Sequence, residues 1–245
     1  MNADHYLFVS DLHLDASLPP AVDQFLAFLD GPARAASGLY ILGDLFEAWV
    51  GDDDLDECRA SVCAALRRYT DSGLPCHVVR GNRDFLLGSA FEARTGCRLL
   101  PDPVLLQLGE LRVFVCHGDV LCRDDVAYQQ LRSIVRQSRW QKAFLALNLA
   151  TRRVLAGAAR KGSQAHTSRA GYRIMDVNPG AVAAGFRVSD ARLMIHGHTH
   201  RPGIHEETVD GQAATRIVLG DWYTQGSCLR LYSDGRYELQ ALPRD

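Results

Sequence analysis

The sequence predicts an α/β protein, a four-layer α/β/β/α sandwich of two mixed β-sheets with a helical insert. Three observations lead to this prediction. Apolar runs alternate with amphipathic helical segments in the first half of the chain, the C-terminal part alternates like antiparallel strands, and a basic helical stretch lies between them. With 245 residues, 47% of them hydrophobic, the chain can bury a large core. We expect this core to comprise residues 1–122 and 176–245, and the insert to span 123–175.

The first half of the chain predicts strand–helix units. Apolar runs at 5–10, 40–42 and 76–79 predict buried strands, because each is short and is followed at once by turn-forming or polar residues. The segment 19–34 predicts a helix, since its apolar side chains recur at helical spacing. A second helix is predicted from about 55 to 70. These strand–helix units, followed by a strand-rich tail, are consistent with two stacked mixed sheets flanked by helices.

The remaining core segments predict strands. They lie at 104–108, 111–116, 193–195, from 204 onward, and at 217–219, 227–232 and 237–242. The tail from 204 alternates between apolar and polar side chains, which is typical of antiparallel strands. We expect this tail to complete the second sheet.

Composition narrows the class of protein. The 27 basic and 29 acidic residues nearly cancel, so net charge indicates no partner. The seven cysteines include no C-x-x-C pair, which favours reduced thiols in a cytosolic compartment. The N-terminal residues show no secretory signal pattern, and no apolar run approaches the roughly 20 residues of a membrane-spanning helix. We therefore expect a soluble protein or one bound to a membrane surface.

Polar side chains follow five of the predicted strands. They are Asp11 with His13, Asp44, Asn82, His117, and His198 with His200. Taken singly, each has an ordinary explanation, such as a helix cap, a turn residue or a surface histidine. Five apolar strands that each end in Asp, Asn or His are difficult to explain by core packing. The set therefore predicts one site at the rim of the sheets.

The residue types in this set indicate metal chemistry. Carboxylate, amide and imidazole ligands without cysteine favour Mn²⁺, Fe or Zn²⁺ over a structural zinc site. Two ions roughly 3.5–4 Å apart, bridged by a carboxylate, form a recurring clamp for displacement at phosphorus and lower the pKa of a bridging water. We predict Asp44 as the shared carboxylate. Arg83, next to Asn82, is suited to bind phosphate oxygens with its guanidinium group.

The order of these motifs resembles a known superfamily. D-x-H, G-D, G-N-x-D, H-G-D and G-H-T-H are similar to the motifs of calcineurin-like metallophosphoesterases, across nearly the whole chain. The resemblance implies one metal held by Asp11, His13, Asp44 and His200. It implies a second metal held by Asp44, Asn82, His117 and His198. The catalytic set would be Asp44, Asn82, Arg83, His117 and His198. His196 falls outside the pattern and is expected to have a structural or supporting role.

A narrower family resemblance adds a substrate class. The stretches 42–49, 81–88, 174–178 and 198–202 are similar to UDP-2,3-diacylglucosamine pyrophosphohydrolases of lipid A biosynthesis. This resemblance implies hydrolysis to UMP and a diacylglucosamine 1-phosphate by attack of a metal-bridging hydroxide on phosphorus. It also implies two Mn²⁺ ions and a peripheral location on the cytoplasmic face of the bacterial inner membrane. The implied substrate contacts are Asn82, Arg83, Asp125, Arg160, Ser163, Thr167 and His198. Ala170 occupies the position of a family lysine, and Arg169 is its candidate replacement.

The insert has an unusual charge pattern. Residues 126–175 contain no Asp or Glu but ten basic residues, interleaved with aliphatic side chains at helical spacing. This pattern favours a lid over the metals that faces an anionic lipid surface, apolar inside and basic outside. One alternative is a helix pair whose apolar stripe is core and whose arginines are solvated. We expect the acidic run Asp52–Asp54 to be a solvated helix start.

Other functions remain open at this point. The basic insert is also compatible with nucleic acid, but it has few aromatic side chains for base stacking, so we expect no nucleic-acid partner. Another phosphodiesterase or phosphatase acting on a non-lipid substrate is the main alternative. A catalytically inactive binding module would lack ligands, and none is missing from the motif set. We expect a monomer.

Overall fold

The structure is a computed structural model that describes residues 5–169 and 176–244, without the side chains of 163–169. Its first sheet has six strands in the order β11-β10-β1-β2-β3-β4. Strands β1 to β4 run parallel to one another, and β10 pairs antiparallel with β1. The strands are β1 (His5–Val9), β2 (Gly38–Leu42), β3 (Cys76–Val79), β4 (Arg98–Leu100), β10 (Gly226–Tyr232) and β11 (Tyr237–Leu242).

The second sheet has five strands in the order β5-β6-β7-β9-β8. Its inner strands β6, β7 and β9 are parallel, and the edge strands β5 and β8 pair antiparallel with them. The strands are β5 (Val104–Leu108), β6 (Leu111–Val115), β7 (Leu193–His196), β8 (Gly203–Val209) and β9 (Gln212–Val218). Both sheets are therefore mixed, as the sequence predicts.

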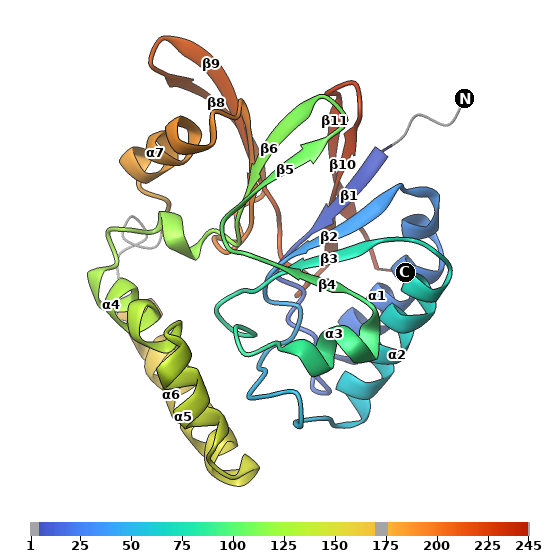
Figure 1. Ribbon diagram of the computed structural model, residues 1–245, viewed down its shortest axis with the longest axis vertical. Coiled ribbons are helices and arrows are strands. Elements are labelled where there is room, and N and C mark those ends of the chain that lie inside the picture. Colours follow the sequence, from blue (N-terminus) through green and yellow to red (C-terminus); the bar gives the residue numbers. More distant parts are fainter. Residues whose placement is uncertain (1–4, 170–175, 245) are drawn as a thin grey trace.

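Successive side chains of the strands point into two different apolar layers. One layer lies between a sheet and its helices, and the other lies between the two stacked sheets. Along β1, Leu7 and Val9 pack toward the helices, whereas Phe8 packs between the sheets with Val115 and Ile195. Three helices and a 3₁₀ turn cover the first sheet: α1 (Pro19–Asp30), η1 (Pro32–Ala35), α2 (Glu57–Asp71) and α3 (Ser89–Thr95). Helix α7 (Pro179–Ser189) covers the second sheet through Phe186. The result is the predicted α/β/β/α sandwich (Figure 1).

The tail divides between the two sheets, so the prediction that it completes the second sheet is only half right. Strands β8 and β9 do join the second sheet, but β10 and β11 extend the first. Strand β10 pairs with β1 from Phe8↔Leu229 to His5↔Tyr232 and covers an edge that would otherwise expose unpaired backbone groups. The alternation of side chains predicts strands but does not say which edge they join. Helices α3 and α7 and strand β4 were not predicted.

The insert leaves the core after the short 3₁₀ helix η2 (Asp119–Leu121) and forms a separate arm (Figure 1). It consists of α4 (Val126–Val135), α5 (Ser138–Leu145) and α6 (Leu149–Arg169). Its two ends lie together, because the side chain of Asn178 donates to Asp124 at 2.9 Å and the backbone N–H of Asn178 donates to Leu121 O at 2.9 Å. No helix among the described residues is long and apolar enough to cross a membrane.

Candidate metal centre and the cavity beside it

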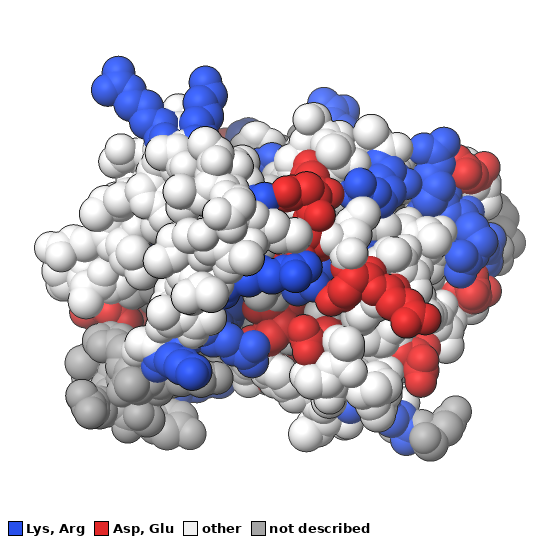
Figure 2. All heavy atoms as spheres, turned by 90° about the horizontal axis from the view of Figure 1, so that it is seen from below, with Lys and Arg blue, Asp and Glu red and all other residues white. Residues whose placement is uncertain are grey.

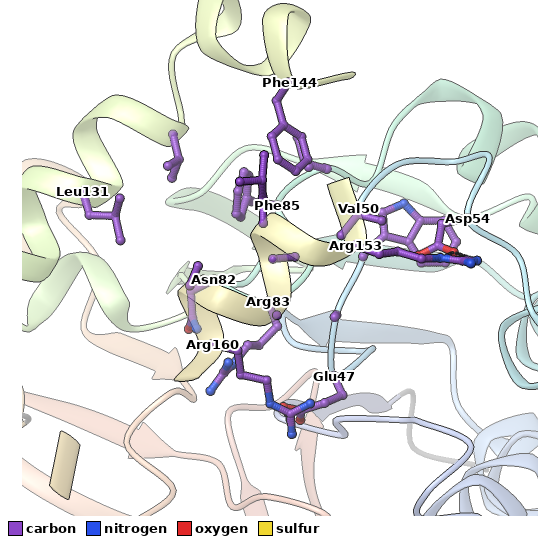
Figure 3. Close-up of a pocket in the computed structure, with 18 of the residues that line it drawn as sticks. Glu47, Val50, Asp54, Asn82, Arg83, Phe85, Leu131, Phe144, Arg153 and Arg160 are labelled. Atoms are coloured by element: carbon purple, nitrogen blue, oxygen red, sulfur yellow. Dashed lines mark hydrogen bonds and ion pairs between the residues drawn. The ribbon is translucent and has the colours of Figure 1, made fainter. Parts of the chain in front are cut away.

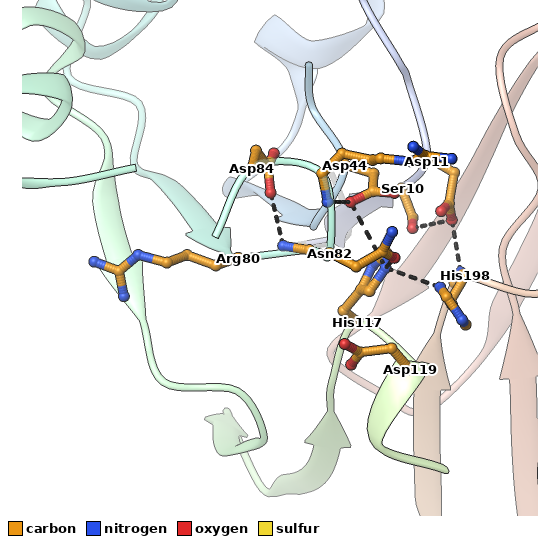
Figure 4. Close-up of polar contacts among 12 residues, drawn as sticks. Ser10, Asp11, Asp44, Arg80, Asn82, Asp84, His117, Asp119 and His198 are labelled. Atoms are coloured by element: carbon orange, nitrogen blue, oxygen red, sulfur yellow. Dashed lines mark hydrogen bonds and ion pairs between the residues drawn. The ribbon is translucent and has the colours of Figure 1, made fainter. Parts of the chain in front are cut away.

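The predicted ligands meet where the carboxyl ends of five strands come together. Asp11 and His13 follow β1, Asp44 follows β2, and Asn82 follows β3 in the first sheet. His117 follows β6, and His198 and His200 follow β7 in the second sheet. Parallel strands deliver their carboxyl ends to the same edge, so stacking the sheets brings both sets together. Figure 4 shows Asp11, Asp44, Asn82, His117 and His198 gathered at this edge.

Five of these residues have a left-handed backbone conformation. Their φ values are positive: Asp11 54°, His13 50°, Asp44 52°, His198 70° and His200 55°. Residues other than glycine rarely adopt this conformation, and such strained positions are enriched at functional sites. The turns that follow β1, β2 and β7 thus direct polar side chains back into the site. No feature of the sequence distinguishes these turns from ordinary ones.

His13, His200 and Asp11 form the first ligand group. The Nε2 atoms of His13 and His200 are 3.3 Å apart. Asp11 Oδ1 lies 3.4 Å from His200 Nε2 and 3.9 Å from His13 Nε2. This oxygen is buried and accepts no well-formed hydrogen bond. Three potential ligand atoms therefore face one another in one small group.

His117, Asn82 and His198 form the second group. Asn82 Oδ1 lies 2.8 Å and His198 Nδ1 lies 3.2 Å from His117 Nε2. On the opposite side of its ring, His117 Nδ1 lies 2.9 Å from the carbonyl oxygen of Leu42, the last residue of β2. A proton on Nδ1 that is donated to this carbonyl leaves the lone pair of Nε2 directed into the site, which is the usual arrangement for a metal-binding histidine.

Asp44 stands between the two groups. Its Oδ2 is 3.8 Å from His13 Nε2, and its Oδ1 is 3.7 Å from His117 Nε2. The backbone N–H of Arg83 donates to Oδ1 at 2.8 Å. Gly81 allows this close approach, because a Cβ atom there would lie 2.1 Å from Asp44 Oδ1. The carboxylate therefore offers one oxygen to each group, as the prediction of a shared ligand requires.

The protonation of the site reflects its excess of buried carboxylates. Burial lowers the pKa of His117, but the carboxylates of Asp44 and Asp11 outweigh this effect and raise the pKa to about 9. Burial and the charge of His117 lower the pKa of His198 to about 4. Burial raises the pKa of Asp11, yet its contacts with His200 and the other imidazoles bring that pKa well below its usual range. The cluster therefore attracts positive charge.

These contacts fit divalent metal ions. Atoms that share one ion at about 2.1 Å lie roughly 3–3.5 Å apart, which matches the pairs around His13 and His117. The ligand atoms of Asp11, His13 and His200, and those of Asp11, Asp44 and His117, each lie within 4.8 Å of one another. Asp11 thus reaches both groups, whereas the sequence prediction assigned it to one. Carboxylate, imidazole and amide ligands suit Mn²⁺, Fe and Zn²⁺.

A second layer of carboxylates, which the sequence analysis did not single out, holds the ligands in position. Asp84 accepts hydrogen bonds from Gly81 N at 2.7 Å and Leu45 N at 2.8 Å, which joins the loops after β3 and β2. Asp102 accepts from the backbone N–H of His117 at 3.0 Å. Asp119 accepts from the hydroxyl of Tyr128 at 2.6 Å. Asp84 and Asp119 belong to the G-N-x-D and H-G-D motifs, so these motifs could have identified both residues from the sequence.

His196 lies beneath the site. Its side chain is fully buried, its Nδ1 is 2.9 Å from Gly197 O, and its Nε2 is 3.3 Å from Arg216 Nη1. Burial lowers the pKa of His196 to about 3, so the ring is neutral and can accept from Arg216. Both ring nitrogens are thus directed at protein atoms rather than at the ligand groups.

The predicted substrate contacts are distributed around the site. Arg83 lies beside the metal cluster, and Arg160 of α6 reaches Glu47 with its Nη2 2.8 Å from Oε1 (Figure 3). Asp125 caps α4 by accepting from Tyr128 N at 3.0 Å. The side chains of Ser163, Thr167 and Arg169, and all of Ala170, lie outside the described residues.

An apolar cavity of about 690 Å³ lies between the core and the insert, and it opens beside the metal cluster at Asn82 and Arg83. Figure 3 shows Phe85 of the core facing Phe144 and Leu131 of the insert across it. Its other apolar walls are Trp49, Val50, Leu86, Val135, Trp140 and Leu155. Its volume falls within the range of ligand pockets, about 300–1,000 Å³.

Several arginines of the insert face inward, in contrast to the expected basic outer surface. Arg132 donates to Asp119 and Asp102, both at 2.8 Å. The acidic run is also not a solvated helix start. Asp53 pairs with the buried Arg152, Asp54 is itself buried and pairs with Arg153, and Asp52 accepts from backbone N–H groups at the start of α3. The core supplies the acids that the insert lacks, because buried arginines need carboxylate partners.

Comparison with known proteins identifies the family. Residues 5–202 match the family model of the calcineurin-like phosphoesterases. The chain belongs to this family. This match and the geometry of the ligand groups make the protein a metal-dependent hydrolase.

Curated relatives match almost the whole chain. A UDP-2,3-diacylglucosamine hydrolase of Stenotrophomonas maltophilia is 49% identical, covering 98% of this chain and 99% of the relative. An Escherichia coli protein with the same name is 46% identical and covers 93% of this chain and 95% of its own length. An Enterobacter relative with that name is also 46% identical, over 94% and 95% of the two chains. The similarity therefore extends through both the core and the insert.

Proposed function

We propose that this protein hydrolyses the diphosphate of UDP-2,3-diacylglucosamine to UMP and 2,3-diacylglucosamine 1-phosphate, a step of lipid A biosynthesis. The observation that carries the proposal is the apolar cavity that opens beside the metal cluster at Asn82 and Arg83. A substrate with a diphosphate and acyl chains needs both features next to each other. The names of the relatives supply the same substrate class.

The ligand groups support a site for two divalent ions, which we propose to be Mn²⁺, with Fe or Zn²⁺ as alternatives. Asp11, His13, Asp44 and His200 would hold one ion, and Asp44, Asn82, His117 and His198 the other. Such ions supply Lewis acidity and lower the pKa of a water molecule that they share. The two groups lie on either side of Asp44, which supports its role as the shared ligand.

The chain's own residues bind and orient the substrate. Arg83 and Arg160 offer guanidinium groups to the phosphate oxygens and stabilise the negative charge that develops on them. Asn82 contributes to the second ligand group and also lines the cavity, so it fixes the distance between the reacting phosphate and the acyl chains. The apolar walls from Trp49 to Leu155 bind the acyl chains and exclude water from them.

The surface of the insert supports the proposal that the protein binds peripherally to the cytoplasmic face of the bacterial inner membrane. Several large apolar side chains are exposed there, with Val154 71% and Val126 61% exposed. Figure 2 shows a largely white surface over the insert, at the left of that view, with blue basic groups at its margin. Exposed apolar side chains beside cationic ones favour anionic lipid surfaces. We propose that a monomer binds there through the insert, without nucleic acid.

Hydrolysis of the lipid substrate tests the proposal. The metal-stripped full chain is assayed on UDP-2,3-diacylglucosamine in detergent micelles, before and after addition of Mn²⁺, beside a soluble phosphodiester. Mn²⁺-dependent release of UMP with little turnover of the soluble ester supports the proposal. Turnover of the soluble ester without turnover of the lipid supports the alternative, a phosphodiesterase with a non-lipid substrate. Binding to anionic but not neutral vesicles checks the membrane surface separately.

A further inference from the structure

Glu47 lies between the metal centre and the insert, and its two carboxylate oxygens face different partners. Oε2 is 3.0 Å from Nδ1 of His13, and Oε1 is 2.8 Å from Nη2 of Arg160 on α6. The Glu47 side chain is only 6% exposed, whereas that of Arg160 is 44% exposed. A single buried carboxylate thus joins a candidate metal ligand to a helix of the insert.

The surroundings of Glu47 hold it in this position. Its backbone N–H donates to the carbonyl of Leu14 at 3.2 Å, which ties the loop after β2 to the loop after β1. The hydroxyl of Tyr223 lies 3.2 Å from Oε2, and the ring of Tyr223 stacks on that of His13 with centroids 4.8 Å apart and planes at 8°. The ring of His13 is therefore held by its face, Glu47 Oε2 approaches its Nδ1 at an ion-pair distance without the angle of a hydrogen bond, and its Nε2 faces His200 and Asp11.

We infer that Glu47 is a positioning residue that couples metal binding at His13 to the seating of α6 against the core. The inference rests on the proposed role of His13 as a metal ligand. A carboxylate beside Nδ1 favours the tautomer with the proton on Nδ1, so the lone pair of Nε2 is available to an ion. Arg160 directs the same carboxylate from the side of the insert. Because coupling between two sites is reciprocal, an ion at His13 strengthens the seating of α6, and the seated α6 strengthens binding of the ion.

Other ion pairs between the insert and the core provide a matched control. Asp53 pairs with Arg152 of the same helix α6, and the sequence distance from Arg152 to Arg160 is about two helical turns. Neither member of this pair contacts a predicted ligand among the described residues. Removing the carboxylate of Asp53 therefore disturbs the attachment of α6 without touching His13.

Metal binding is measured on the metal-stripped full chain by calorimetric titration with Mn²⁺. Glu47→Gln is expected to weaken one of the two sites by about 10- to 100-fold, the usual effect of losing a carboxylate behind a ligating histidine. Arg160→Gln is expected to weaken the same site by at least about 5-fold through the coupling. Asp53→Asn, which leaves Glu47 and Arg160 in place, is expected to weaken that site by less than Arg160→Gln does. A Glu47→Gln variant with wild-type affinity at both sites overturns the inference.

Hydrogen exchange of residues 149–162 in α6 tests the coupling from the other side. Addition of Mn²⁺ to the wild-type chain is expected to slow exchange there, and Glu47→Gln is expected to abolish the effect while Asp53→Asn retains it. Exchange in α6 that is indifferent to Mn²⁺ in the wild type overturns the inference.

His13→Ala separates the inference from the proposed function. If His13→Ala loses one ion while Glu47→Gln keeps both at full affinity, the metal centre stands and the role of Glu47 is wrong. If His13→Ala keeps both ions, the proposed ligand set is itself wrong, and the inference falls with it.

Discussion

His13 and His200 are separated by 187 positions in the sequence, yet their Nε2 atoms lie 3.3 Å apart. His13 follows β1 of the first sheet, and His200 follows β7 of the second. The contact exists only when the two sheets are stacked, so the metal centre belongs to the tertiary fold rather than to any local motif. Metal binding and folding are therefore linked.

Chelation is expected to destabilise the protein. An ion that binds the folded chain but not the unfolded one adds about 2.7 kcal/mol to the free energy of unfolding at 100 times its dissociation constant. Thermal melts of the Mn²⁺-loaded chain, with and without EDTA, measure the effect. His200→Ala should retain only part of the metal-dependent shift. A melting temperature that is independent of Mn²⁺ would contradict the ligand assignment.

Replacement of the shared carboxylate is expected to abolish activity and reduce bound metal together. Asp44→Ala removes the oxygens that face His13 and His117, so activity should fall by about 10³-fold or more, equivalent to several kcal/mol of transition-state stabilisation. Metal content by mass spectrometry and UMP release are measured on the same sample. Asp190→Ala is the control, because Asp190 also has a left-handed backbone conformation but caps α7. Full metal content in Asp44→Ala would exclude the shared role.

A single methyl group at Gly81 is expected to displace Asp44. The Cβ of Gly81→Ala would lie 2.1 Å from Asp44 Oδ1 and 2.3 Å from Asp44 N, so the backbone or the carboxylate must move. We expect weaker Mn²⁺ binding and lower activity. Gly162→Ala in α6 is the control, because its Cβ meets no atom of the described residues within 4 Å and helices favour alanine. Equal metal affinities in the two variants would argue against the need for glycine at 81.

Charge in the apolar cavity is expected to affect the lipid substrate selectively. Leu155→Asp places a carboxylate in the cavity wall, so kcat/KM for UDP-2,3-diacylglucosamine should fall by about 10- to 200-fold, as expected for loss of 1–3 kcal/mol of apolar contact. Turnover of a soluble phosphodiester should change little. Ala158→Asp adds the same charge to α6 at an exposed position outside the cavity wall. Equal losses of kcat/KM on the two substrates would indicate that the acyl chains do not bind in this cavity.

His196 is expected to make the fold acid-sensitive. Its pKa is about 3 in the folded protein and about 6.5 in the unfolded chain, so between these values the unfolded chain binds more protons. The free energy of unfolding should therefore fall as the pH drops below about 6.5, by about 2 kcal/mol at pH 5.0. Urea unfolding of the wild type and of His196→Gln at pH 7.5 and 5.0, both with chelator, isolates the contribution of His196 to the pH dependence of the free energy of unfolding. An equal pH dependence in both proteins would rule it out.

Much of the architecture could be predicted from local pattern. The short apolar runs identified β1, β2 and β3, and the polar residues after the strands are those that the structure brings together. The partner of β10 could not be predicted, because alternation fixes the faces of a strand but not its neighbours. The left-handed turns at Asp11 and Asp44 were likewise invisible, since they depend on contacts that form only when the sheets pack.

The charges of the insert show a different limit. Counting basic residues predicted a cationic outer surface, whereas Arg132 and Arg152 are directed at carboxylates of the core. A charge and its partner can lie far apart in the sequence, as Arg152 and Asp53 do at a separation of 99 positions. Local sequence therefore identifies a charged segment but not whether its charges are neutralised in the fold.

The junction of the insert has a consequence for how such enzymes diverge. The chain leaves and re-enters the core at one place, where Asn178 is hydrogen-bonded to Asp124 and Leu121. A segment attached through a closed junction can change its length and sequence without altering the strand order of either sheet. The residues of the metal cluster then reside in the core, whereas the cavity is shared between the core and an exchangeable arm. New specificities can evolve by replacement of the arm while the catalytic rim is inherited intact.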